Sequence, residues 1–481
     1  MAHPEDVRSE LERRTMRKVS RRLMPFLILC YLVAYIDRTN IGFAALTMNA
    51  DLGISSAAFG LGGSLFFVAY VLFEVPSNLA QQRFGARRWI ARIMISWGVV
   101  GMTMTFMNGT PMFYALRFLL GAAEAGFFPG AVLFITQWFP RRQRASMVAL
   151  FMIAIPTSNV LGSPLAALLL SLDGLMGLAG WQWLFTLESI PAVLLGFFAL
   201  TILSDGPGDA RWLAAEERDW LTTRLASERE PGASDHPAIL QTLTNGKVWL
   251  LAIIYCGSSA TSNALSLWQP QIIKSFGVSI WETAALNTIP FAIAAAFMLH
   301  WGRRADRTGE RIGATAIPLL VTTCAIFGTL LTSSLWVTMV LLTLVLVGNY
   351  AIKGPFWALS SETLPPSLAA GGLAAINAIA HLGTAGANAA VGAIHERTAA
   401  FAAALVPLGI LTGLGVLITL LIGRQRSQDL GVKVDQAGSI ERPGDQQGQA
   451  AQGTEQLGRT SSFRETAAPG VATGMGAQSE H

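Results

Sequence analysis

Charged side chains are scarce in this chain of 481 residues. Lys, Arg, Asp and Glu together make up 13% of it, whereas 52% of the residues are hydrophobic and the net charge is +4. A soluble domain carries about 25% charged residues. A water-soluble protein of this composition would expose far more apolar surface than soluble monomers do. The composition therefore excludes a soluble enzyme, a disordered protein and a nucleic-acid-binding protein.

Cysteine and histidine are also scarce, and they show no metal-site pattern. Without a CxxC pair, the three cysteines indicate neither a disulfide framework nor a structural zinc site. The six histidines lack ligand spacing, which argues against a metal, a cofactor and a membrane-embedded enzyme. A receptor would need a soluble output domain, and the sequence shows none. The cysteines, all in apolar runs, are Cys30, Cys256 and Cys324.

Twelve long apolar stretches fill most of the chain instead. Each is near the roughly 20 residues that a helix needs to cross a bilayer, and none shows the alternation of barrel strands. We predict an all-α membrane protein with twelve transmembrane helices in two pseudo-symmetric six-helix halves. The predicted helices are 24–46, 57–79, 89–108, 112–136, 145–169, 183–203, 247–272, 284–301, 312–333, 337–361, 368–392 and 400–423. The predicted segments are a cytoplasmic N-terminal segment (1–23), an N-terminal half (24–203), a central cytoplasmic loop (204–246), a C-terminal half (247–423) and a disordered cytoplasmic tail (424–481).

Basic residues in the loops predict the orientation of the helices, because cytoplasmic loops are enriched in Lys and Arg. The even-numbered loops are basic, whereas the odd-numbered loops hold almost only Lys274 and Arg397. We expect a multi-pass protein of the inner cell membrane with both termini in the cytoplasm. The basic residues of the even-numbered loops are Arg83, Arg87, Arg88, Arg141, Arg142, Arg144, Arg303, Arg304, Arg307 and Arg311.

The two halves repeat each other at an offset of 224 residues. Two repeated membrane halves are typical of a secondary transporter with its site at mid-membrane, between the halves. Prolines and glycines inside the predicted helices fit bent helices that rock during alternating access. The matching positions are Gly53-Ile54-Ser55 with Gly277-Val278-Ser279, and Arg83, Gly85 and Arg87 with Arg307, Gly309 and Arg311.

Helices one and four carry ionisable residues inside the membrane, where such groups are costly and mark functional sites. Asp37 and Arg38 lie half-way along helix one, and Arg117 and Glu124 lie on helix four. Their seven-residue spacing puts Arg117 and Glu124 on one face about 10 Å apart, so each is expected to meet the helix-one pair. A buried arginine binds carboxylates through its planar fork, and a buried carboxyl can load and release a proton. The alternative is a static set of charges that only holds the two helices together.

Residues 302–311 read Gly-x-x-x-Asp-Arg-x-Gly-x-Arg, which resembles a loop motif of the major facilitator superfamily. The first copy departs from it, with Asn78 for the Gly and Gln82 for the Asp. We expect the motif glycine to permit close helix approach, and its Asp to face a helix terminus or an Arg. The resemblance implies a latch for one state of the cycle; the alternative is that the basic loops only set the topology. The predicted gate and loop residues are Glu74, Arg83, Gly85, Arg87, Gly302, Asp306, Arg307, Gly309 and Arg311.

Five further segments resemble the anion:cation symporter family of that superfamily: 37–40, 74–79, 117–130, 138–140 and 354–359. The resemblance covers about 18–423 and implies proton-coupled uptake of a small organic anion, with no cofactor besides the coupling proton. We expect a tartrate-like dicarboxylate or a sugar acid. A phthalate- or hydroxyphenylacetate-type aromatic acid, a proton-independent exchanger or facilitator, and a drug or sugar-phosphate exporter are the alternatives. The superfamily resemblance also implies a monomer.

The same resemblance assigns roles to individual residues. Asp37 and Glu124 would carry protons, Arg38 would anchor a substrate carboxylate, and Arg117 would tune Glu124 within the binding site. The other residues implied to line the site are Tyr35, Tyr70, Trp357 and Asn377.

The second half has no counterpart of the four charges, so neutral polar residues would set its selectivity. Lys353 either adds positive potential for a dianion or extends toward the cytoplasm. His381 either senses protons or packs in the bundle. Trp268 and Trp357 offer flat faces to an aromatic acid or a sugar acid. The neutral polar candidates are Asn263, Gln269, Asn349, Asn377, His381 and Asn388.

Overall fold

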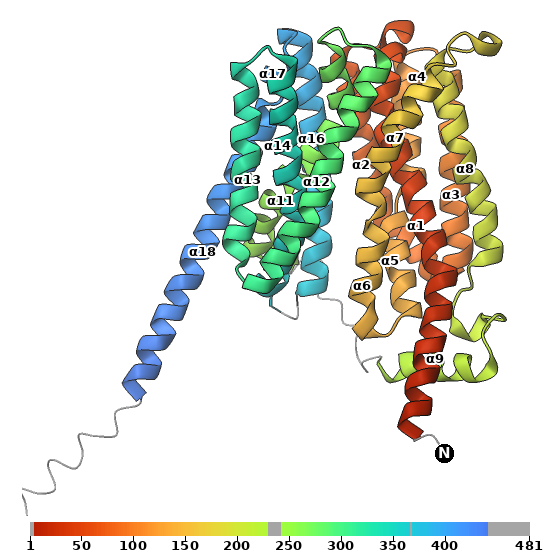
Figure 1. Ribbon diagram of the computed structural model, residues 1–481, viewed down its shortest axis with the longest axis vertical. Helices are drawn as coiled ribbons and strands as arrows, with labels where there is room; N and C mark the ends of the chain where they lie inside the picture. The colour runs from red at the N-terminus through yellow and green to blue at the C-terminus, as the bar shows by residue number, and fades with distance from the viewer. Residues whose placement is uncertain (1–3, 229–241, 366–367, 441–481) are drawn as a thin grey trace, which may run out of the picture. The chain divides into compact units, whose positions relative to one another are not determined.

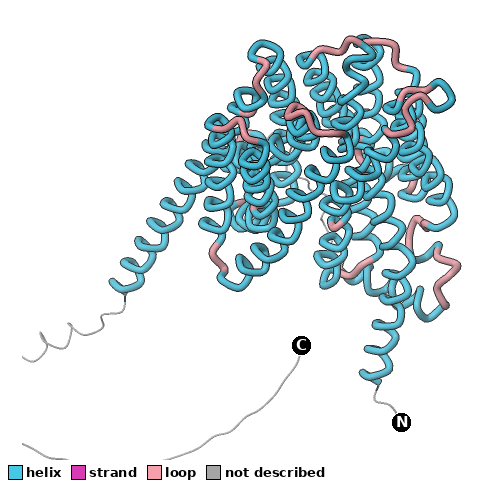
Figure 2. The backbone as a smooth tube through the Cα atoms, turned by 45° about the horizontal axis from the view of Figure 1, so that its top comes forward, coloured by secondary structure: helices cyan, strands magenta, loops and turns pink. Residues whose placement is uncertain are grey.

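A computed structural model describes residues 4–228, 242–365 and 368–440. Within these ranges all regular structure is helical and there is no strand, as Figure 2 shows. The chain divides into two units, 1–423 and 424–481, and the membrane helices belong to the first.

The helices of the first unit form two groups that correspond to the predicted halves (Figure 1). The first group consists of α1 (Pro4–Leu52), α2 (Ser56–Phe84), α3 (Ala86–Thr103), α4 (Thr110–Glu124), α5 (Phe127–Trp138), α6 (Arg141–Met152), α7 (Ala154–Leu170) and α8 (Gly180–Ile202). The second consists of α11 (Gly246–Lys274), α12 (Ile280–Thr308), α13 (Arg311–Gly328), α14 (Leu335–Ala351), α15 (Lys353–Thr363), α16 (Ala369–Thr398), α17 (Phe401–Ala404) and α18 (Val406–Ile440). Only the part of α18 up to residue 423 belongs to the first unit. The short helix α9 (Ala215–Ser227) lies between the groups in the sequence.

Eleven of the described helical spans are long and apolar enough to cross a membrane. The remaining predicted span, 368–392, coincides with α16, which is 30 residues long but carries several Asn, His and Gly residues. Because α16 packs against α2 and α11, its polar side chains lie inside the bundle rather than against lipid. The structure is therefore the expected all-α membrane fold of twelve helices in two halves.

The first and last helices extend beyond the boundaries that were predicted for the two terminal segments. Helix α1 begins at Pro4, so the polar residues before position 24 extend the first membrane helix. At the other terminus α18 continues to Ile440, so the start of the segment expected to be disordered is helical. Residues 441–481 of that segment lie outside the described residues.

Three predicted helices are each interrupted near the middle. The fourth breaks between α4 and α5 at Ala125 and Gly126, where Gly126 has a left-handed φ of 86°. The fifth breaks at Ile153 and the tenth at Ile352. The first break makes Glu124 the last residue of α4, and the third makes Lys353 the first residue of α15.

The repeated Gly-x-Ser motif starts equivalent helices in the two halves. Ser55 accepts a hydrogen bond from the Ala58 N–H at 3.2 Å, and Ser279 accepts one from the Glu282 N–H at 3.1 Å. Such caps satisfy N–H groups that lack a partner in the first turn of a helix. The capped helices, α2 and α12, are both 29 residues long and begin 224 residues apart. The predicted internal repeat is therefore confirmed.

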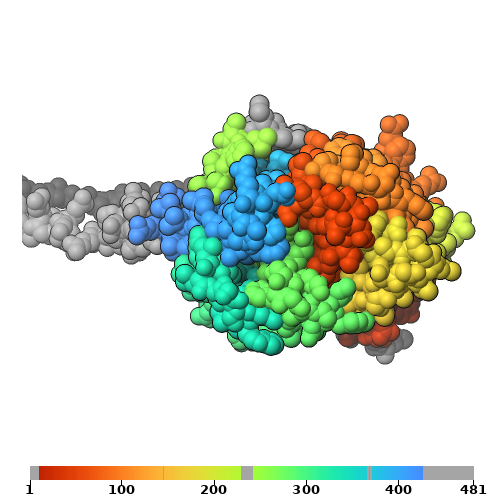
Figure 3. All heavy atoms as spheres, turned by 90° about the horizontal axis from the view of Figure 1, so that it is seen from above, coloured from red at the N-terminus to blue at the C-terminus, as the bar shows by residue number. Residues whose placement is uncertain are grey.

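The halves meet at the end of the bundle that carries residues 53–55, which we call the closed end (Figure 3). There Ser64 donates a hydrogen bond to the Ala385 carbonyl at 2.5 Å, and Asn287 donates one to Ser163 at 2.9 Å. Helices α2 and α16 approach so closely that a Cβ on Gly60 would lie 2.5 Å from the Asn388 carbonyl oxygen. Glycine is thus required there for the halves to pack.

We expect Gly60→Ala to weaken the closed end, because overpacking a tight contact costs about 1–3 kcal/mol. Spin labels at the exposed positions Ala50 and Arg397 should report an added population at longer distance. Gly386→Ala is the matched control on α16, since a Cβ at Gly386 meets nothing within 4 Å. Identical distance distributions for wild type and Gly60→Ala would show that this contact does not hold the halves together.

The opposite end, which we call the basic end, carries α9 and the loops after α2 and α12. Helix α9 is fastened to α1 there, because Arg14 and Lys18 form ion pairs with Glu217 at 3.2 and 2.8 Å. Burial disfavours the charged form of Glu217, but hydrogen bonds from Lys18 and the Ala214 N–H outweigh it and lower the pKa of this carboxyl. The start of the central loop is thus bound to the N-terminal half.

Candidate functional site

A cavity of about 90 Å³ lies between the two halves. It is far smaller than the roughly 300–1,000 Å³ of sites for drug-sized ligands. Residues of the N-terminal half on its wall include Tyr35, Arg38, Phe66, Arg117 and Asn159. Residues of the C-terminal half on its wall include Ser262, Asn263, Tyr350, Lys353, His381 and Asn388.

Arg38 on α1, a residue of the cavity wall, forms an ion pair with Glu124 on α4. The Nη2–Oε1 distance is 2.6 Å, and Glu124 is only 1% exposed. The Arg38 guanidinium carbon also lies 5.1 Å from the ring centre of Tyr70 and 5.2 Å from that of Tyr35. The expected contact between helix four and the helix-one pair is therefore confirmed for Glu124. Arg117 forms no ion pair or hydrogen bond with that pair in the described residues. Within the described residues, the second carboxylate oxygen of Glu124 has no hydrogen-bond partner.

Two further cations face the same cavity from opposite halves. Arg117 lies 4.8 Å above the ring centre of Phe66, and the Lys353 ammonium lies 4.2 Å above that of Tyr350. Neither forms an ion pair within the part of the chain that the structure describes. The sequence left two positions open for Lys353, beside the substrate or extended toward the cytoplasm. In the structure Lys353 lies on the cavity wall. Unpaired cations that share one small cavity attract an anion, and the aromatic faces beneath them also stabilise their charge.

Asp37 lies behind the cavity wall rather than on it. Its Oδ2 accepts a hydrogen bond from the Trp97 indole N–H at 2.6 Å, and the residue is buried. One helical turn further along α1, Asn40 donates a hydrogen bond to Glu188 on α8. Sequence reasoning missed Glu188, although it is an acidic residue inside the predicted helix 183–203. The cost of burying a carboxylate is the signal that marks it.

The remaining predicted binding residues divide into two groups. Tyr35 lines the cavity, and Tyr70 is buried beside Arg38. Trp357 and Asn377 are not among the residues on the cavity wall, and Trp357 packs against Tyr255 with ring centres 4.7 Å apart. Their binding roles stay predictions.

The neutral polar candidates of the second half also divide. Asn263, His381 and Asn388 line the cavity, whereas Gln269 and Asn349 are buried off its wall. Asn349 nevertheless donates a hydrogen bond to Ser262, a residue of the wall. The His381 ring also stacks on Phe67, with ring centres 5.6 Å apart. Trp268 packs against Phe59 away from the cavity wall, at a ring distance of 5.2 Å.

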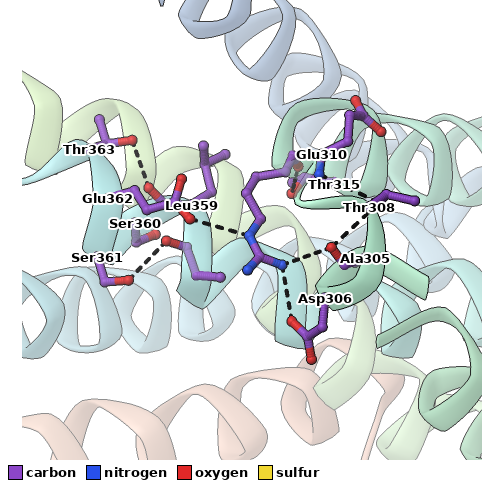
Figure 4. A network of polar contacts seen from close by, with 12 residues as sticks. Ala305, Asp306, Thr308, Glu310, Thr315, Leu359, Ser360, Ser361, Glu362 and Thr363 are labelled. Carbon is purple, nitrogen blue, oxygen red and sulfur yellow. Dashed lines mark hydrogen bonds and ion pairs between the residues drawn. The ribbon is translucent and has the colours of Figure 1, made fainter. Parts of the chain in front are cut away.

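The second copy of the loop motif forms an ion-pair network at the basic end. Arg311 pairs with Asp306 at 3.0 Å and with Glu362 at 3.2 Å, and thereby connects α12, α13 and α15 (Figure 4). The expectation that Asp306 faces an arginine is confirmed. Gly309 ends α12 with a left-handed φ of 67°, which favours glycine. The expectation for Gly302 is wrong, because a Cβ there would meet nothing within 4 Å and so glycine serves no close approach.

The first copy is held together differently, since Gln82 replaces the motif Asp. Asp205, after α8, instead accepts a hydrogen bond from the Arg87 N–H at 2.9 Å. Gly85 again has a left-handed φ, 86°, and Arg83 lies over the ring of Phe84. Glu74 is partly exposed further up α2 and does not line the cavity.

We expect Arg311→Gln to lower the free energy of unfolding by about 1 kcal/mol, because partly exposed ion pairs each contribute about 0.2–1 kcal/mol. Thermal unfolding of the purified protein in detergent measures the loss, and high salt should reduce it. Arg307→Gln is the matched control, because Arg307 is exposed and lies in the same motif. Equal melting temperatures for both variants would contradict a structural latch.

The model of the Major Facilitator Superfamily matches residues 27–388. The chain belongs to this superfamily. It is therefore a multi-pass membrane transporter and not an enzyme.

Relatives and solved structures agree with this assignment. The chain is 44% identical over 423 residues to a protein of Agrobacterium vitis named "Putative tartrate transporter", covering 88% of this chain and 98% of the relative. It is 38% identical over 430 residues to the "Quinolone resistance transporter" of Acinetobacter baumannii, covering 88% and 99%. The crystal structure of a D-xylose–proton symporter superposes with a TM-score of 0.67 at 17% identity, over 83% of this chain and 96% of that one, which supports the fold. The chain is thus similar to transporters of small organic substrates.

Proposed function

We propose that this protein is a proton-coupled importer of a small organic anion, a tartrate-like dicarboxylate or a sugar acid, that works as a monomer by alternating access. The observation that carries the proposal is the Arg38–Glu124 ion pair beside two unpaired cations in one cavity. A carboxyl that can take a proton thus contacts a cation that can take the substrate.

The orientation follows from the loop charges. The basic end, with Arg83, Arg87, Arg307 and Arg311 near it, would face the cytoplasm of a cell whose inner membrane holds the protein. The hydrogen bonds of Ser64 and the other contacts between halves at the closed end would then seal the outer side. We assign the structure to the inward-facing state on this basis.

The anion would bind between the halves. Arg117 on α4 would hold one carboxylate through its planar fork, and Lys353 on α15 would attract a second from the opposite half. Serine, asparagine and tyrosine side chains of α11 and α14 would bind the hydroxyl groups of the substrate. The small cavity favours a compact acid, and the name of the 44% identical relative supports tartrate.

The proton would act through Glu124. When Glu124 is ionised it holds Arg38, as in the structure. When Glu124 is protonated the ion pair loses its charge attraction, and Arg38 becomes available to a substrate carboxylate. Release of the proton to the cytoplasm would restore the pair and expel the anion. Asp37, hydrogen-bonded to Trp97 behind this pair, would be a second proton carrier.

Uptake into proteoliposomes tests the proposal. The probes are labelled tartrate, galactonate and phthalate, each with and without an inward proton gradient. We expect the gradient to drive accumulation of tartrate or the sugar acid above equilibrium. Accumulation of phthalate instead would favour the aromatic-acid alternative. Entry of all three acids that ignores the gradient would overturn proton coupling and leave exchange or facilitation.

Export of a carboxylate drug is the second candidate, favoured by the 38% identical relative named for quinolone resistance. The small cavity speaks against it in this state. Norfloxacin efflux from the same vesicles distinguishes the two functions.

A further inference from the structure

Glu188 is a buried carboxyl that the proposed transport cycle leaves without a role. It lies on α8, is 5% exposed, and receives one hydrogen bond, from the side-chain amide of Asn40. Its Oε2 atom is buried without a hydrogen-bond partner in the described residues. No ion pair involving Glu188 occurs in those residues either. A carboxylate in such a place is poorly stabilised unless it is protonated.

Asp37 lies close to Glu188 on the facing helix. Asp37 and Asn40 are three residues apart on α1 and therefore lie on one face of it. Asn40 contacts Glu188 directly, and the charges of Asp37 and Glu188 are close enough to repel each other. The hydrogen-bond donors to the two carboxyls, the Trp97 indole and the Asn40 amide, are both neutral.

Few charged side chains on the neighbouring helices lie near Asp37 and Glu188. Arg38, Arg117 and Glu124 act on Asp37 from the cavity side. Helix α7 carries no titratable residue between Ala154 and Leu170, and α3 presents the indole of Trp97. Two carboxyls that share an apolar region cannot readily both be ionised, so such a pair tends to hold a proton.

We propose that Glu188 and Asp37 form a two-carboxyl proton-binding site, separate from the Arg38–Glu124 pair, that takes up one proton in each transport cycle. This inference rests on the proposed function. A second proton also balances the two negative charges of a dicarboxylate substrate. A dianion that enters with one proton carries a net negative charge against the membrane potential, whereas a dianion with two protons is neutral.

Glu188→Gln tests the proposal, because the amide keeps the size and the oxygen acceptor for Asn40 but cannot ionise. Uptake driven by a proton gradient is measured as a function of external pH. We expect the half-maximal pH to move toward acid by about one unit, since the shared proton loses the second negative charge that favours it. The substrate KM at saturating acidity should change less than twofold. The matched control is Asp219→Asn, an exposed carboxyl on α9, which should leave the profile unchanged.

Glu188→Asp keeps a titratable group and should restore part of the wild-type profile, which a merely structural role would not produce. It also serves as the test variant if Glu188→Gln does not fold. A wild-type pH profile, or an equal loss of uptake at every pH, would overturn the role of Glu188. If wild-type uptake does not depend on the proton gradient, the proposed function itself is wrong. That outcome differs from a gradient-dependent wild type whose pH profile Glu188→Gln leaves unchanged, which would refute only the Glu188–Asp37 site.

Discussion

Glu124→Gln is expected to abolish accumulation of the substrate against its gradient while preserving exchange of substrate across the membrane. The amide matches the size of the carboxyl that now lies 2.6 Å from Arg38, but it carries no charge and cannot load a proton. Arg38 would therefore stay available to the anion in every state of the cycle. Counterflow and gradient-driven uptake, measured in parallel in proteoliposomes, separate these two activities.

We expect gradient-driven uptake to fall at least tenfold, and counterflow to remain within a few-fold of wild type. Glu216→Gln, an exposed carboxyl on α9, is the matched control and should keep both activities. Retention of full accumulation by Glu124→Gln would remove this carboxyl from the coupling mechanism. Loss of both activities in a folded variant would point to the static role of the Arg38–Glu124 pair.

Arg117→Gln is expected to produce the largest loss of substrate affinity. Arg117 lines the cavity without a carboxylate partner in the described residues, so its guanidinium is free to bind the anion. A hydrogen bond to a charged group contributes about 1.5–3 kcal/mol, which corresponds to roughly 10- to 150-fold weaker binding. Isothermal titration of the purified protein with tartrate measures this change directly.

The matched control is Arg92→Gln, because Arg92 lies over the ring of Trp89 on α3 and does not reach the cavity wall. We expect its tartrate affinity to equal that of wild type. An Arg117→Gln variant that binds tartrate as tightly as wild type would exclude Arg117 as an anion anchor. The substrate would then be held by Arg38 or Lys353 alone.

Much of the fold could be predicted because local patterns determine it. Apolar length predicts the membrane helices, and the Gly-x-Ser repeat predicts the starts of α2 and α12. The interruption at Ile352 also has a local cause, because Pro355 in the first turn of α15 lacks the N–H that would bond to the Ala351 carbonyl. By contrast, the sequence pattern does not specify that α16 lies between α2 and α11, so the burial of its polar side chains could not be predicted.

The candidate site could be predicted only in part. The charged residues on predicted helices one and four led us to expect a contact between Glu124 and helix one, and Glu124 does pair with Arg38. Whether a side chain lines the cavity depends on how its helix is rotated, and one residue along a helix turns by about 100°. Lys353 lines the cavity, whereas Trp357, one turn later on nearly the same face of α15, packs against the cavity residue Tyr255 and does not reach the wall. Glu188 was missed because it has no companion charge on its own helix.

Proton movement driven by the substrate alone tests the central claim most directly. Proteoliposomes with a pH-sensitive dye inside are prepared at equal internal and external pH, and tartrate is added outside. We predict that the interior becomes acidic as tartrate enters, that phthalate or buffer alone has a smaller effect, and that Glu124→Gln abolishes the response. Entry of labelled tartrate into wild-type vesicles without any acidification would contradict proton coupling through the Arg38–Glu124 pair.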